Sequence, residues 1–298
     1  MKNTRLMILG LALIVLVIVA YIIMQKPGER SATPGQRDRL TDIDSAQVTA
    51  LEIVSPTQRI EITKQGAEWR LRKPLVYRAD QGLVGALISQ LQSLRSRGIV
   101  STNPEKQALF RVDSTGTIVT VEMDAGAPVS LVIGKMGTAY TETYVRLAGS
   151  NEVHLVNASL STVGTRGVNE WRDKIIINVP REDIRSVQYQ YGDTTFTLAF
   201  QDSLWAVGGV PADNATVNML LTSLAEVRAD GFVDTPPDGH PAPRAVVSYS
   251  GRELRFYEGT SSDEYRVQSS AGNQWFDVKA WRAGQILKRK DDLRAKTP

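Results

Sequence analysis

Histidine, cysteine and paired carboxylates are the residue types that most often carry catalysis or bind metals, and this chain offers few of them. It has no cysteine, which excludes disulfides, thiolate catalysis and cysteine-ligated metals. Its two histidines are His154, in the alternating segment EVHLV, and His240, in the proline-rich segment TPPDGHPAP. A serine–histidine–aspartate triad would have to use one of them, and neither lies in a nucleophile-elbow context. We therefore expect no catalytic residue.

Phosphate-binding and metal-binding motifs are also missing from the sequence. Gly134-Lys135 resembles the end of a phosphate loop, but Val129 stands where that loop requires its first glycine. No HExxH, paired-histidine or aspartate-rich calcium motif occurs. Adjacent carboxylates such as Asp291 and Asp292 lie near the C-terminus, where they are expected to be solvated, whereas general acid–base catalysis needs a pocket. We expect no metal and no cofactor.

The most distinctive string is NEWRDKIII, residues 169–177. Its pattern predicts the end of an amphipathic helix followed by the entry into a strand, with Trp171 packed beneath. In the alternative interpretation this string is a ligand or partner site, where Glu170, Arg172 and Asp173 would make the contacts.

The N-terminus carries an apolar run that is long enough to cross a membrane. Leu6–Met24, which includes Leu13 and Val17, is 19 residues without a charge. As a helix this run spans about 28 Å, close to the hydrocarbon thickness of about 30 Å. A cleaved signal peptide is the alternative, but its apolar region is shorter and ends in small residues. We expect an uncleaved anchor over residues 1–24.

The charge distribution argues against nucleic-acid binding. The chain has 35 basic and 32 acidic residues, and removing residues 1–30 leaves 31 of each. A nucleic-acid-binding protein normally carries a clustered basic surplus. Lys2 and Arg5 precede the apolar run, and large domains translocate largely regardless of charge. We expect a bacterial inner-membrane protein with a single span, a cytoplasmic N-terminus and a periplasmic body.

The body repeats one pattern of short alternating segments. The first copy opens with VTALEIV, RIEITK and EWRLRKP, and the second opens with IRSVQYQY, TTFTLAF and SLWAVGG. Such alternation predicts strands. The alignment pairs Trp69 with Trp205, so both are expected to be structural core residues, together with Trp171.

A helix follows the opening strands in both copies. Asp80 and Asp213 are well placed as N-caps, and apolar residues at helical spacing continue until Gly98 and Gly231. Each copy then returns to strands and ends in a helix-like segment, over 157–173 and 279–295. The sequence therefore predicts an α+β fold, in which antiparallel strands and segregated helices form two tandem repeats after the transmembrane helix. The expected domains are the anchor (1–24), a linker (25–41) and the two repeats (42–178 and 179–298).

At Trp69-Arg70-Leu71 and Arg172-Asp173-Lys174 the chain resembles the bacterial family called domain of unknown function 4340. The resemblance implies an N-terminal membrane segment and a β-rich body, and it assigns no reaction. Members often accompany ABC-transporter components of the gliding-motility type, which implies an auxiliary envelope role. The link Gly208-Gly209-Val210-Pro211 departs from the first copy.

Two functional hypotheses follow. In the first, the protein is a non-catalytic accessory or binding module in the periplasm, with the inner membrane and ABC-transporter permease or ATPase subunits as partners and no nucleic acid. In the second, it is an envelope hydrolase with an unrecognised active site. A pocket with convergent carboxylates would favour the hydrolase.

Overall fold

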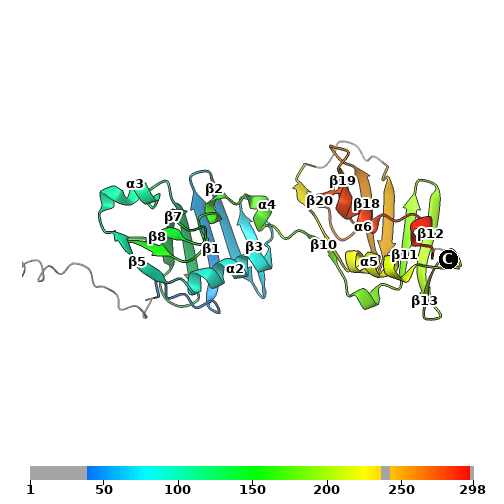
Figure 1. The fold of residues 1–298 in the computed structure, drawn as a ribbon, viewed down its shortest axis with the longest axis horizontal. Helices are drawn as coiled ribbons and strands as arrows, with labels where there is room; N and C mark the ends of the chain where they lie inside the picture. The colour runs from blue at the N-terminus through cyan, green and yellow to red at the C-terminus, as the bar shows by residue number, and fades with distance from the viewer. Residues whose placement is uncertain (1–38, 236–241, 296–298) are drawn as a thin grey trace, which may run out of the picture. The chain divides into compact units, whose positions relative to one another are not determined.

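The computed structural model describes residues 39–235 and 242–295, so the expected anchor and His240 lie outside it. Two large antiparallel sheets dominate these residues, and the helices are few and mostly short (Figure 1). Within the same residues, no helix combines the length and apolarity that a membrane crossing requires.

The first sheet has nine strands in the order β4-β3-β2-β1-β6-β7-β8-β9-β5. Its strands are β1 (Val48–Ser55), β2 (Gln58–Gln65), β3 (Glu68–Lys73), β4 (Tyr77–Arg78), β5 (Ser96–Ser101), β6 (Thr117–Met123), β7 (Val129–Met136), β8 (Thr143–Leu147) and β9 (Val153–Val156).

The second sheet also has nine strands, in the order β14-β13-β12-β11-β17-β18-β19-β20-β16. Its strands are β11 (Ser186–Tyr191), β12 (Thr194–Gln201), β13 (Leu204–Val207), β14 (Val210–Pro211), β16 (Gly231–Val233), β17 (Ala245–Tyr249), β18 (Arg252–Glu258), β19 (Glu264–Ser269) and β20 (Trp275–Lys279). A separate two-stranded sheet pairs β10 (Ile175–Asn178) with β15 (Glu226–Arg228).

The two nine-stranded sheets have one strand order, so each strand of the first sheet has a counterpart in the second. Residues correspond as well as strands. The bridge between Ala79 and Arg172 is repeated between Ala212 and Arg294. We call two residues counterparts when they hold the same register position in the two sheets.

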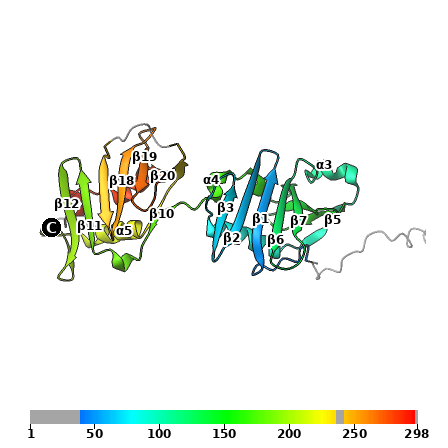
Figure 2. The same cartoon turned by 180° about the vertical axis from the view of Figure 1, so that it is seen from behind.

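The described helices comprise two longer ones and several short ones. They are α2 (Gln81–Gln92), α3 (Gln107–Phe110), α4 (Val168–Trp171), α5 (Asn214–Ala225) and α6 (Ala280–Ile286), with short 3-10 turns at Pro104–Lys106, Val163–Thr165, Arg181–Asp183 and Asp291–Leu293. The two views show α2 on one face of the first sheet, and α5 and α6 on one face of the second (Figures 1 and 2). On the opposite face of the first sheet, Phe110 of α3 packs against a small buried cluster of Val112, Val132 and Val153.

Alternation along the strands explains this arrangement, because a sheet with one packed face buries every second side chain. Ile60 and Ile62 of β2 are fully buried, as are Val187 and Tyr189 of β11. The apolar side of α5 packs into the same core. Its buried residues, at the spacing the sequence predicts, are Val217, Leu220, Leu221 and Leu224. The expected N-caps are present too, with Asp80 and Asp213 each accepting a backbone N–H through a carboxylate oxygen.

The helical content is lower than expected. Gly98 and Gly231 do not close the helices: α2 and α5 end at Gln92 and Ala225, and both glycines lie in strands. Gly98 has φ +154° beside a register irregularity in β5, a conformation that suits glycine in a bulged strand. The segments expected as terminal helices contain only short helical pieces between extended residues. The α+β prediction therefore overestimated helix, because helical spacing over a few turns does not outweigh pairing at a sheet edge.

Contacts divide the described chain into two compact units. The first contains the described residues up to Val48, with Ile53–Thr57 and Ile88–Gly164. The second contains Thr49–Glu52, Gln58–Leu87 and the described residues from Thr165 onward. In the first unit the end of the predicted linker is already packed, since Thr41 is buried and its hydroxyl donates to the Leu91 carbonyl.

Candidate binding surface

An open groove lies at the end of the helix-covered face of the second sheet. Phe200 of β12 and Trp205 of β13 are directly opposite in the ladder, and their ring centroids are 5.4 Å apart. The groove has a volume of about 390 Å³, and Ile184 and Leu221 supply its remaining apolar lining. The apolar floor of the groove is therefore built by β12, β13, α5 and the turn before β11.

Charged side chains complete the lining of this groove. Arg181, Glu182 and Arg185 come from the turn that leads into β11. The Arg185 guanidinium lies 5.3 Å from the centroid of the Phe200 ring, within the range of a cation–π contact. Arg181 donates to Oδ1 of Asn218 on α5. Two guanidinium groups and one carboxylate give the groove a net positive charge.

The first sheet does not build such a groove at the corresponding place. The counterpart of Phe200 is Lys64, which pairs with Trp69 and carries its ammonium 5.9 Å from the indole centroid. The counterparts of Arg181, Glu182 and Arg185 are the uncharged Ser45, Ala46 and Thr49 in the repeat alignment.

Burial of the two expected core tryptophans differs accordingly. Trp69 is buried, with 8% of its surface exposed, and Gln81 at the start of α2 hydrogen-bonds its backbone N–H and C=O. Trp205 is only half-buried and packs at the border of the second core. Trp205 therefore packs against the second core and also forms part of the groove wall.

The string at residues 169–177 is built into the fold. Arg172 is 1% exposed, and its guanidinium donates to Asp234, Asn169 and Gln274. It also lies 3.7 Å from the centroid of the Phe232 ring. The expected packing of Trp171 agrees with its full burial.

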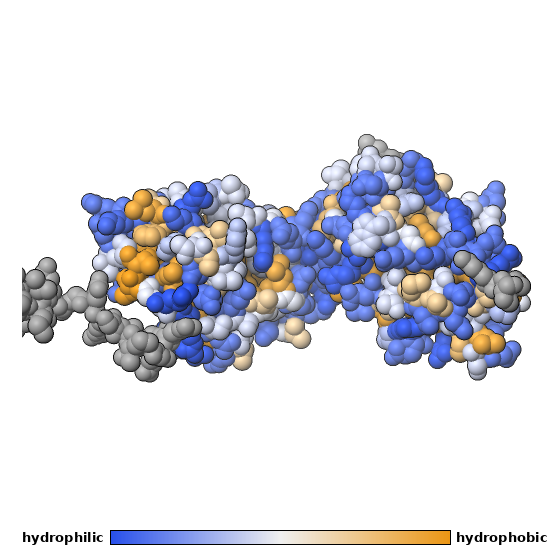
Figure 3. Space-filling view, viewed as in Figure 1, coloured by the Kyte–Doolittle hydropathy of each residue, from blue (hydrophilic) through white to orange (hydrophobic). Residues whose placement is uncertain are grey.

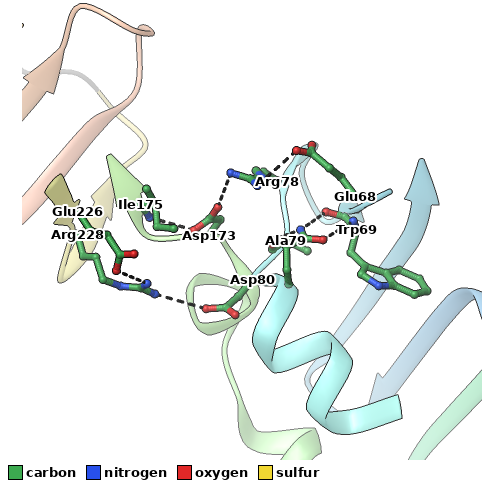
Figure 4. A network of polar contacts seen from close by, with 10 residues as sticks. Glu68, Trp69, Arg78, Ala79, Asp80, Asp173, Ile175, Glu226 and Arg228 are labelled. Carbon is green, nitrogen blue, oxygen red and sulfur yellow. Dashed lines mark hydrogen bonds and ion pairs between the residues drawn. The ribbon is translucent and has the colours of Figure 1, made fainter. Parts of the chain in front are cut away.

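The residues suggested for external contacts are largely turned to internal ones, since Arg172 and Asp173 are buried. Asp173 is 6% exposed, accepting from Arg78 at 3.0 Å and from the Ile175 backbone N–H (Figure 4). Glu170 is exposed but accepts the Gly167 N–H at the start of α4. Arg172 and Asp173 are buried and form ion pairs inside the protein, and the interaction role suggested for them stays a prediction.

His154, the histidine that the structure describes, is 7% exposed in β9. Its Nδ1 lies 3.0 Å from the Ser96 hydroxyl, and its Nε2 lies 3.5 Å from Glu152. Burial lowers the pKa of His154, and the Glu152 carboxylate partly opposes that effect. Across residues 39–235 and 242–295, no three acidic or histidine side chains are grouped to hold a metal ion.

Other exposed apolar side chains lie apart from the groove. Figure 3 shows them over α3 and β5 of the first sheet, where Leu109, Ile99 and Val100 are exposed. Leu204 is 59% exposed beside Trp205 but points to the opposite face of its strand, because successive strand residues alternate. These residues do not line the groove.

Comparison with known proteins gives a family and no activity. The family model described as "Domain of unknown function (DUF4340)" matches residues 69–245, more than half of the chain. Neither the curated proteins nor the solved structures gave a match. The matched region begins at Trp69 and includes the Arg172 string, α5 and the Phe200–Trp205 pair. On this evidence the chain belongs to the DUF4340 family.

Proposed function

We propose that this protein is a non-catalytic, membrane-anchored accessory protein that binds a component of an ABC-type transport system in the periplasm. The observation that carries the proposal is the groove of the second sheet, where Phe200 is 36% exposed against the half-buried Trp205. Exposed aromatic side chains in a groove are typical of binding surfaces, in which aromatic anchors supply much of the affinity. The anchor expected from Leu6–Met24 would keep this groove close to inner-membrane permeases.

The lining of the groove defines the chemistry of its occupant. An apolar or aromatic side chain would pack on the Phe200 and Trp205 rings. A neighbouring carboxylate would meet Arg181 or Arg185, which present planar guanidinium groups at the rim. We infer that the occupant is a periplasmic segment of the transporter with an apolar residue next to an acidic one.

The experiment is affinity purification of the tagged full-length protein from detergent-solubilised membranes, followed by mass spectrometry. The wild type should recover ABC permease or ATPase subunits. Phe200→Lys should lose them, since it installs the residue of the first sheet and removes the apolar floor. Lys64 already packs on Trp69 in the first sheet, so Phe200→Lys should leave the melting temperature nearly unchanged.

Leu204→Glu is the matched control. It also replaces an exposed apolar residue with the residue that the first sheet carries, Glu68, but it does not line the groove. It should retain the transporter subunits. Recovery of the same subunits with Phe200→Lys would overturn the groove as the binding site. Turnover of an envelope substrate by the purified protein, without any transporter subunit, would overturn the accessory function itself.

A further inference from the structure

The edge strand of the first sheet exposes several large apolar side chains. β5 lies at the end of the strand order and pairs with β9 on one side. Ile99 and Val100 of β5 are exposed, and so is Leu109 of α3, which follows β5 in the chain (Figure 3). Tyr140, in the loop between β7 and β8, is the most exposed of the group. We call these four residues the edge patch.

Contacts within the first unit place Tyr140 and α3 at the two ends of β5. Arg97, near the start of β5, forms an ion pair with Glu142 of the loop that carries Tyr140. At the other end, Gln107 of α3 donates to Asn151 in the turn between β8 and β9. The edge patch therefore follows β5 from one end to the other.

The described chain begins beside the same strand. Arg39 forms a β-bridge with Arg95, the residue before β5. Ile99 lies four residues further on, about 13 Å away in an extended strand. Fourteen residues, 25–38, separate Arg39 from the apolar run, and a chain of that length spans at most about 50 Å. An anchor at Leu6–Met24 would therefore keep the edge patch within reach of the membrane surface.

Basic side chains accompany the edge patch at α3. Lys106 and Arg111, on either side of the exposed leucine of α3, are exposed themselves. The exposed Lys135 lies beside them, with its ammonium 6.0 Å from the centroid of the Phe110 ring. With Glu105 as the neighbouring acid, this group has a net positive charge. Apolar side chains next to basic ones are typical of surfaces that bind anionic membranes.

The second sheet covers the corresponding apolar residue with protein. Phe232 of β16 is the counterpart of Ile99 in the repeat alignment. Phe232 is 8% exposed, because its ring packs 5.7 Å from the Phe276 ring and 3.7 Å from the Arg172 guanidinium. Ile99 is 51% exposed. Both copies keep an apolar residue at this position, but only the first copy presents it to its surroundings.

Another strand is a poor partner for this edge. The ladder between β5 and β9 shifts register between Ser96 and Gly98 and again between Ile99 and Ser101. Bulges of this kind twist an edge strand and discourage a further strand from pairing with it. A lipid surface requires no register. The headgroup region, unlike the bilayer core, also holds water that can satisfy the free backbone groups of the strand.

We propose that the edge patch rests on the inner membrane, with Ile99, Val100 and Leu109 at the boundary between the headgroups and the acyl chains of anionic lipids. Tyr140 would lie at the same level, where tyrosine is enriched in membrane proteins. The basic side chains at α3 would meet the lipid phosphates. This contact depends on the anchor of the proposed function, because tethering supplies the proximity that a small patch needs.

The test uses a single cysteine as the site of a fluorescent label, since the chain has none of its own. Full-length Leu109→Cys is labelled and reconstituted into nanodiscs of phosphatidylcholine and phosphatidylglycerol, in which some lipids carry a nitroxide quencher at the headgroup. Its label should be quenched several-fold more strongly than a label at Leu204→Cys. Leu204 is the matched control, because it is also an exposed leucine but lies outside the edge patch. Lys106→Glu combined with Arg111→Glu should lower the quenching at Leu109 to the control level.

A label at Gln25→Cys, next to the apolar run, reports on the anchor separately. Quenching at Gln25 without quenching at Leu109 would overturn the membrane contact and leave the proposed function standing. A lack of quenching at Gln25 would overturn the anchor and this contact with it. Equal quenching at Leu109 and Leu204, or quenching that the charge reversal leaves unchanged, would also overturn the contact. A label at Leu109 that is shielded from water but not quenched would show that a second copy or another protein covers the patch instead.

Discussion

Arg172 and Arg294 hold the same register position in the two sheets, yet their surroundings differ. Each bridges the alanine that precedes an N-capping aspartate, Ala79 or Ala212. The side chain of Arg172 is 1% exposed and forms an ion pair with Asp234. The side chain of Arg294 is 41% exposed and forms an ion pair with Asp291. Removing one partner of a buried ion pair costs more stability than removing one partner of a pair that water screens, because the other charge is left unpaired.

We therefore expect Arg172→Ala to destabilise the protein by about 2–3 kcal/mol, below the usual cost for a fully buried pair because the Asp234 side chain is 54% exposed. The loss combines the hydrogen bonds of the guanidinium with its packing on Phe232. Urea denaturation of the purified protein measures it. Arg294→Ala, the matched control, should cost about 1 kcal/mol or less. Equal costs for the two variants would contradict this account.

His154 should make stability depend on pH. Its folded pKa is lowered by burial, so below its ordinary value of 6.5 the unfolded chain binds a proton more readily than the folded protein. The stabilising contribution of neutral His154 is present above pH 6.5 and is lost as the pH falls below it. His154→Gln keeps a hydrogen-bonding group beside Ser96 and removes the titration. Between about pH 7.5 and about pH 5.5 the melting temperature should fall less in the variant than in the wild type. A parallel fall in both proteins would exclude His154 as the cause.

At the scale of elements, the sequence predicts what local patterns encode. Alternation located the opening strands, and caps with apolar stripes located α2 and α5. The Gly208-Gly209 link, which departs from the first copy, is a two-residue hairpin turn between β13 and β14. Both glycines have positive φ, at 57° and 81°, as the favoured tight hairpins require. The ends of helices were missed because edge pairing of β5 and β16 is a nonlocal interaction.

The candidate sites were harder to predict than the elements. The string around Arg172 stands out in the sequence because it places Trp171 among charged residues, but these features serve internal packing. The groove leaves a weaker signal, namely an apolar Phe200 where the first copy has Lys64. That signal is visible only when the two copies are aligned. The open pocket that Arg95 and Arg97 line gathers residues from three separate segments, so no linear motif marks it.

The unequal burial of the two tryptophans leads to a prediction about β3 and β13. Trp69→Ala should cost about 3–5 kcal/mol, as for other large core aromatics. Trp205→Ala should cost about 1–2 kcal/mol, because Trp205 is only half-buried. Chemical denaturation of both variants gives the two values. If Trp205→Ala costs as much as Trp69→Ala, then Trp205 is a core residue after all.

At the scale of the whole molecule, the duplication gives two similar sheets that have diverged at their surfaces. The second sheet carries an aromatic groove where the first has a lysine over its tryptophan. The counterparts Arg97 and Asp230 carry opposite charges, and each forms an ion pair with its own partner, Glu142 and Arg282. Each difference lies outside the buried strand residues, so it leaves the core packing intact. A duplicated scaffold of this kind allows the two copies to bind different ligands.

The proposed groove would be held beside inner-membrane permeases only if the N-terminal run behaves as an anchor, which leads to the last prediction. We expect Leu6–Met24 to remain on the mature protein and the body to lie outside the cytoplasm. The reason is the length of the run and the lack of small residues at its end, where Tyr21-Ile22-Ile23-Met24 follows Ala20. Mass spectrometry of the protein from the membrane fraction should find the residues before Met24. A reporter phosphatase fused after Pro298 should be active, and a cytoplasmic reporter at the same position should be silent.

Substitution within the run makes this prediction sharper. An arginine at the centre of a membrane helix costs about 2.5–3.5 kcal/mol, so Leu13→Arg combined with Val17→Arg should abolish insertion and leave the fused phosphatase inactive. Leu13→Ile combined with Val17→Leu is the matched control, because it changes the same positions and keeps the run apolar, and it should behave like the wild type. A mature N-terminus that begins after Met24 would show that the run is a cleaved signal. The N-terminal run would then not confine the groove to the membrane surface.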